Sequence, residues 1–108
     1  MKESKFVKIV TFVPESHADA VRQAMGDAGA GVIGNYTYCF SSSKSIGSFK
    51  PGVGANPTIG EVGKFETVDE IRIESLCDKN KVGAVKNAIL KVHPYEEAPI
   101  DIYPMLEV

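Results

Sequence analysis

The sequence predicts a single α+β domain over residues 1–108, because one β-α-β pattern occurs twice along the chain. Residues 84–89 (AVKNAI) repeat residues 20–25 (AVRQAM) almost unchanged. Both segments carry apolar residues at helical spacing, and both lie between segments rich in β-branched and aromatic residues. A chain of this length forms one core, and its crossovers are right-handed. We therefore expect a ferredoxin-like βαββαβ fold, an antiparallel four-stranded sheet with two helices on one face.

The first half of the chain contains the first β-α-β pattern. Residues 6–13 predict a strand, because β-branched and aromatic residues dominate them. The helix that follows is indicated by apolar residues at helical spacing, namely Val21, Ala24, Met25 and Ala28. We expect Ser16 to cap the N-terminus of this helix and Gly29 to end it. The alternating aromatic residues of segment 36–40 predict the second strand.

The second half repeats this order. Residues 68–76 alternate in polarity and predict the third strand. The second helix is indicated by Val82, Val85, Ile89 and Val92. Asp78 is expected to cap this helix, and Pro94 is expected to end it. Residues 100–103, which lie between two prolines, predict the last strand.

A glycine-rich excursion is expected at about residues 41–63. All glycines except Gly83 lie between Gly26 and Gly63, and the excursion is too long for a hairpin turn. Two interpretations stay open. The excursion is either a long β-extension that docks on a neighbouring subunit or a mobile surface loop.

Composition and charge argue against several classes of protein. The formal net charge is −2, whereas nucleic-acid binding depends on clustered Lys and Arg. No apolar run approaches the roughly 20 residues that span a bilayer, and the N-terminal run is too charged for a signal peptide. We therefore expect no nucleic-acid or membrane partner and a cytoplasmic location. Cys39 and Cys77 form no disulfide framework and no metal-binding CxxC motif, so inert thiols in strands are expected.

The segment 93–99 (HPYEEAP) is the densest cluster of chemically active side chains. His93, Glu96 and Glu97 are ligand types for a divalent cation, and an imidazole also serves as an acid or base. The structural alternative is that Tyr95 covers the edge of the core and that both glutamates are solvated. Adjacent carboxylates in an extended segment point to opposite sides, which argues against a shared metal.

Three stretches together resemble a known family: residues 29–36 (GAGVIGNY), 54–63 (GANPTIGEVG) and 92–104 (VHPYEEAPIDIYP). They resemble the PII/CutA-like domain inserted in YqfO-type proteins, the Nif-three-like dinuclear-metal-centre family. The resemblance covers residues 6–106, although Glu97-Ala98-Pro99 stands where the family has Glu-Pro-Ala. It implies a CutA/PII-like fold, a stand-alone version of the insert, and self-association as a trimer, with a dimer as the alternative.

The resemblance also limits what can be expected of the activity. In complete YqfO-type proteins the flanking domains bind the two metal ions, and those metal-binding motifs have no counterpart here. The hydrolase-like and GTP cyclohydrolase-like labels of full-length relatives are therefore not carried over to this chain.

The expected function is that of a non-catalytic, oligomeric binding or sensing module. It would bind a small ligand or a divalent metal ion at subunit clefts. The candidate ligand-binding residues are Asn35, Asn56, Glu61, His93, Tyr95, Glu96 and Glu97, of which His93 and Glu96 are also the candidate metal ligands. Two alternatives remain: a structural interaction protein that docks on a separately encoded partner, and a small enzyme with His93 as acid or base.

Overall fold

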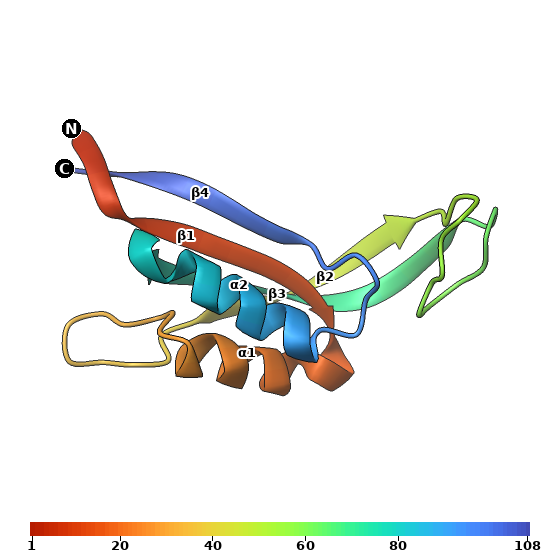
Figure 1. Ribbon diagram of the computed structural model, residues 1–108, viewed down its shortest axis with the longest axis horizontal. Coiled ribbons are helices and arrows are strands. Elements are labelled where there is room, and N and C mark those ends of the chain that lie inside the picture. Colours follow the sequence, from red (N-terminus) through yellow and green to blue (C-terminus); the bar gives the residue numbers. More distant parts are fainter.

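The computed structural model describes residues 1–108 and contains an antiparallel four-stranded sheet with two helices on one face (Figure 1). The strand order is β2-β3-β1-β4, which confirms the predicted ferredoxin-like arrangement. The elements in chain order are β1 (Lys2–Pro14), η1 (Glu15–His17), α1 (Ala18–Asp27), β2 (Ser41–Phe49), β3 (Glu66–Asp78), η2 (Lys79–Lys81), α2 (Val82–Val92) and β4 (Ile100–Glu107).

The hydrophobic core lies between the two helices and one face of β1 and β3. Alternate residues of β1 point into it, because successive side chains of a strand face opposite sides of the sheet. The largest fully buried side chains of the core cluster are Ile9, Val13, Val21, Met25, Ile73, Val85 and Ile89. Cys77 of β3 belongs to this cluster, and burial raises the pKa of its thiol. The buried thiol of Cys77 is therefore protonated at neutral pH and packs as a small hydrophobic group.

The C-terminal ends of both α-helices follow the predicted signals, whereas the two predicted N-terminal caps do not. Gly29 adopts φ +105° directly after α1, and the N–H groups of Gly29 and Ala30 donate to Gly26 O and Met25 O at 3.0 Å each. This pair of bonds is a Schellman motif, which requires positive φ at its glycine. Asp78 accepts a hydrogen bond from Asn80 N at 2.9 Å, but this bond caps the short 3-10 turn η2. The N-cap of α2 is Lys81, which makes no side-chain capping bond, so the predicted cap of the second helix at Asp78 is wrong.

The predicted cap of the first helix also differs from the structure. Ser16 lies in the short 3-10 turn η1, and its Oγ contacts Nδ1 of His17 at 2.9 Å instead of capping a helix. The predicted cap at Ser16 is wrong because η1 separates β1 from the first residue of α1.

The predicted position of the second strand is also wrong. β2 spans Ser41–Phe49, whereas residues 36–40 belong to a loop outside the strands. In that loop Ile33 and Tyr36 form a small isolated bridge, and Tyr38 has a positive φ of 53°. Cys39 is consequently half-buried in a loop and lies in no strand.

The serine-rich sequence of β2 forms a strand because it lies at the edge of the sheet. It pairs only with β3, from Ser41 opposite Glu74 to Phe49 opposite Glu66. An edge strand is exposed to water, so polar residues are tolerated there. The first part of the expected excursion is therefore strand. We call residues 50–65, which join β2 to β3, the arm loop.

The two long strands β2 and β3 extend past the region that the helices cover, and the arm loop lies at their far end (Figure 1). The segment from α2 to β4 turns at the same end of the molecule (Figure 1). No helix is long and apolar enough to cross a membrane.

Candidate binding groove

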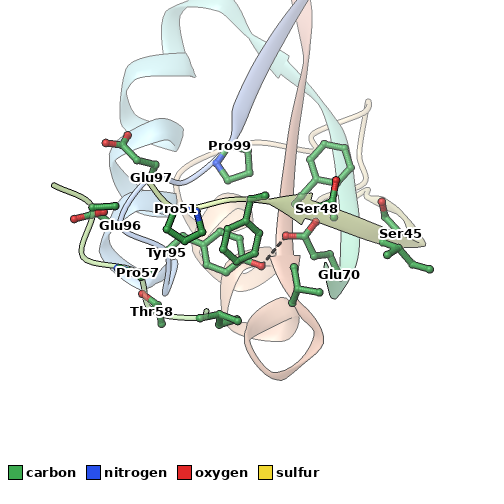
Figure 2. A pocket seen from close by; sticks show the side chains of 17 residues that line it. Ser45, Ser48, Pro51, Pro57, Thr58, Glu70, Tyr95, Glu96, Glu97 and Pro99 are labelled. Atoms are coloured by element: carbon green, nitrogen blue, oxygen red, sulfur yellow. Dashed lines mark hydrogen bonds between the residues drawn. The ribbon is translucent and has the colours of Figure 1, made fainter. Parts of the chain in front are cut away.

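A groove with a volume of about 500 Å³ lies between β2, the arm loop and residues 95–99 (Figure 2). Its apolar lining includes Phe12, Phe49, Ile59 and Val68. Its ionisable lining residues are Glu70, Tyr95, Glu96 and Glu97. No Lys or Arg side chain lines the groove, so its fixed charges are all negative.

Glu70 and Tyr95 point toward one another in the groove (Figure 2). Tyr95 Oη donates to Glu70 Oε2 at 2.6 Å, and Glu70 is only 8% exposed. Burial raises the pKa of Tyr95, and the hydrogen bond to Glu70 raises it further. The phenol therefore stays protonated and serves as a permanent donor to the carboxylate.

Gly47 of β2 leaves the space that the Glu70 carboxylate occupies. A Cβ atom at position 47 would collide with Glu70 Oε1. A glycine within a strand often marks such a close approach, and here the approaching group is a carboxylate.

His93 lies behind the groove and fixes the backbone that carries Tyr95. It is 8% exposed, and its Nε2 lies 2.7 Å from Phe12 O. A carbonyl oxygen only accepts, so Nε2 carries the proton, and Nδ1 accepts from Tyr95 N at 3.2 Å. Burial lowers the pKa of His93. The imidazole is therefore neutral with both nitrogens occupied, and a metal ion at His93 would have to displace one of these backbone groups.

The arm loop docks on the segment after α2 through two contacts. Asn56 N donates to Glu96 Oε1 and Oε2 at 3.0 and 3.2 Å, and Thr58 Oγ1 donates to Pro94 O at 2.7 Å. Through these bonds the arm loop contacts a segment of its own chain. These bonds close one side of the groove.

The structure brings together most of the predicted ligand-binding residues, but not all. Tyr95, Glu96 and Glu97 line the groove, whereas Asn56 and His93 contact lining residues without lining it themselves. Two further residues lie outside it. Glu61 pairs with Lys64 at 3.0 Å within the arm loop, and Asn35 is exposed in the loop between α1 and β2. No group of three or more His, Cys, Asp and Glu side chains gathers closely enough to hold a metal ion.

Sequence reasoning missed Glu70 and Gly47. Glu70 stands in a predicted strand with other charged residues, so nothing local distinguishes it. Its burial depends on Tyr95, which is 25 residues further along the chain. The one local signal was Gly47, because a glycine in a strand indicates a bulge or a close approach.

Comparison with solved structures first defines the class of fold. The CutA protein of Archaeoglobus fulgidus, described as a periplasmic divalent cation tolerance protein, matches with a TM-score of 0.71 and 15% identity over 95% of this chain and 86% of that one. The GlnK-ATP complex of Bacillus subtilis matches with a TM-score of 0.63 and 14% identity over 97% and 84% of the two chains. At these identities the likeness shows the fold alone, and the fold is CutA/PII-like.

Sequence comparison then identifies the relatives. No protein-family model matches the chain. The "GTP cyclohydrolase 1 type 2 homolog" of Bacillus subtilis is 52% identical over 98 residues, and that of Halalkalibacterium halodurans is 50% identical over 98 residues. A NIF3-related protein of Bacillus cereus matches in structure with a TM-score of 0.82 and 43% identity over 96% of this chain. The chain is thus homologous to a segment of NIF3/YqfO-family proteins, which confirms the resemblance in sequence.

The chain spans about a quarter of the length of these relatives, since it covers 26% of each. The activity that their names describe therefore belongs to proteins much longer than this chain.

Proposed function

We propose that this domain is a non-catalytic binding module whose ligand occupies the groove beside Glu70 and Tyr95. The observation that carries the proposal is the groove itself. Segments distant in sequence meet there and enclose about 500 Å³. Ligand sites commonly have volumes of about 300–1,000 Å³, an apolar lining and a few convergent polar groups.

Binding is favoured over catalysis by the state of His93. A general acid or base needs a nitrogen that can exchange a proton with the bound molecule. Both nitrogens of His93 bond to backbone groups, and the ring does not line the groove. The imidazole therefore supports the position of Tyr95 and has no proton-transfer role in this proposal.

The proposed module self-associates, and the resemblance to PII and CutA proteins favours a trimer. Both outer strands, β2 and β4, lack a partner on one side. Exposed strand edges and large exposed apolar side chains promote association. Ile46 of β2, which lines the groove, and Phe65 of the arm loop, which does not, are 75% and 70% exposed. Self-association would place the groove at a cleft between subunits.

The test is a two-dimensional ¹⁵N–¹H NMR screen of small molecules, with shift changes mapped onto the sequence. We expect ligands to shift amides along the groove. Ala55→Trp, which fills the groove from the arm loop, should abolish these shifts. Val53→Trp is the matched control, because Val53 is fully exposed on the same loop and does not line the groove. Shifts that cluster elsewhere, or persist in Ala55→Trp, would contradict the proposal.

A further inference from the structure

We propose that the groove takes an organic cation, an ammonium group on an apolar body, with Glu70 as its counter-ion. This inference rests on the proposed function of the groove and names the chemical class of its ligand. It is carried by the contacts and charges around the Glu70 carboxylate.

The Glu70 carboxylate has no positively charged partner within the chain. Glu70 is 8% exposed, yet it takes part in none of the ion pairs of the chain. Glu74, four residues later on the same strand, is more exposed but contacts Lys8 and Arg72 at 3.0 Å each. Burying a carboxylate without a cation is unfavourable. Glu74 has Lys8 and Arg72 as positively charged neighbours, and a cation that enters the groove would supply the corresponding positive charge for Glu70.

One oxygen of the Glu70 carboxylate is free to accept a hydrogen bond from a ligand. Tyr95 occupies Oε2, while Oε1 accepts no hydrogen bond from the protein. Oε1 packs against Gly47, where an added Cβ atom would collide with it, and both residues line the groove, so a ligand would reach Oε1 from the groove side. An ammonium group can donate hydrogen bonds to Glu70 Oε1 and to a lone pair of Tyr95 Oη. The lone pair is available because the phenol uses its proton to donate to Glu70 Oε2.

The rest of the groove combines apolar side chains with negative charge. Phe12, Phe49 and Val68 provide an apolar wall next to the carboxylate. Glu96 and Glu97 lie on the other side of the groove from Ser45 and add negative potential there (Figure 2). With no Lys or Arg in the lining, a polyphosphate would meet only repulsion. A divalent metal ion requires several oxygen ligands at once, and no such group gathers here.

The experiment compares three probes of similar shape by NMR titration: phenethylamine, 2-phenylethanol and phenylacetate. Phenethylamine should bind in the groove at least tenfold more tightly than 2-phenylethanol, and phenylacetate should bind most weakly. Added salt should weaken the binding of the amine. An acetylated and amidated Leu-Lys-Leu peptide, titrated in parallel, distinguishes a lysine side chain from a free amine as the source of the ammonium group.

Glu70→Gln should reduce the affinity for phenethylamine at least tenfold and leave that for 2-phenylethanol unchanged. Glu74→Gln is the matched control on the same strand and should change neither. If Glu70→Gln fails to fold, the ratio of amine to alcohol affinity in the unaltered protein decides the matter alone. Groove binding without preference for the amine would overturn this inference and leave the binding module standing. Absence of groove binding by every probe would overturn the inference, and failure of the wider screen would overturn the binding module as well.

Discussion

At the scale of a single residue, His93 gives the protein a predictable response to acid. The folded protein needs the neutral ring, because a second proton on Nδ1 would remove the acceptor for Tyr95 N. Burial lowers the pKa of His93, and the repulsion of His17 adds to this, while the bond to Phe12 O and the charge of Glu70 oppose it. Tyr95, the remaining titratable neighbour, stays neutral in this range.

We predict that the free energy of unfolding decreases as the pH falls below the ordinary histidine pKa of 6.5. Below pH 6.5 the histidine of the unfolded chain binds a proton, whereas His93 in the folded chain remains neutral until the pH reaches its lowered pKa. The stability that the neutral ring contributes is therefore fully present above pH 6.5 and is lost as the pH falls toward the pKa of the folded state. A single group changes the free energy by at most about 1.4 kcal/mol per pH unit. Urea unfolding at a series of pH values between 7.5 and 5 measures this pH dependence of the free energy of unfolding. His93→Asn should flatten the curve, and His17→Gln should not; an unaltered curve in His93→Asn would contradict the assignment.

The hydrogen bond between Tyr95 and Glu70 yields a second prediction at this scale. Tyr95→Phe removes the only hydrogen bond to a buried carboxylate. Leaving a buried polar group unpaired costs about 1–3 kcal/mol, so the variant should be destabilised by about that amount. Urea unfolding is the measurement. Tyr103→Phe is the control, because Tyr103 is half exposed and forms no side-chain hydrogen bond; its change should stay within about 0.5 kcal/mol. Equal stability of the two variants would show that the bond contributes nothing.

At the scale of the elements, one glycine that directly follows α1 and one within α2 should respond to the same substitution with opposite signs. Gly29 has φ +105° in the Schellman motif, and a Cβ there would lie 2.7 Å from Lys81 Cδ. Gly83 lies in the first turn of α2, where an added Cβ would have open space around it. Gly29→Ala should destabilise the protein by about 1–2 kcal/mol, because positive φ is unfavourable for alanine. Gly83→Ala should stabilise it by about 0.5–1 kcal/mol. Thermal unfolding of both variants checks the pair, and a shift in the same direction would refute the argument.

The elements also show what the sequence could and could not predict. The helices were predictable because the spacing of residues such as Val21, Met25 and Ile89 is a local property that the core then uses directly. The second strand was not. The alternating aromatic residues of 36–40 resemble a strand, but the serine-rich residues 41–49 form the second strand. Backbone pairing with β3 determines which residues are in the strand. Edge strands carry little hydrophobic signal, so nothing local separates them from loops.

The same reasoning applies to the candidate site. Segment 93–99 was predictable from its density of functional side chains, and Tyr95, Glu96 and Glu97 line the groove. Glu70 was not predictable, because its burial is created by Tyr95 and by the space at Gly47. The charge imbalance in the groove is a property of the tertiary structure.

At the scale of the whole molecule, the two ends of the chain lie side by side (Figure 1). Lys2 pairs with Glu107 across β1 and β4, and their side chains form an ion pair of 3.7 Å. A domain whose ends meet can be accommodated within a longer chain without distortion. This geometry agrees with relatives in which the homologous segment is 26% of the protein.

The last prediction concerns self-association through the far end of the β2–β3 extension. Phe65 and Val62 of the arm loop and Ile46 of β2 are all exposed, and large exposed apolar side chains on a small domain favour contact with another copy. We expect light scattering after size exclusion to give a multiple of the monomer mass. Phe65→Lys should raise the dissociation constant at least tenfold, because a charge cannot be buried unpaired in an apolar contact.

Leu90→Lys is the matched control for this prediction. Leu90 is 49% exposed and belongs to α2, outside both β2 and the arm loop, so the variant should keep the mass of the unaltered protein. Because Phe65 does not line the groove, loss of association with retained groove binding would show that one copy suffices for the site. Loss of both together would show that a neighbouring copy completes it. A monomeric mass for the unaltered protein at about 100 μM would contradict self-association.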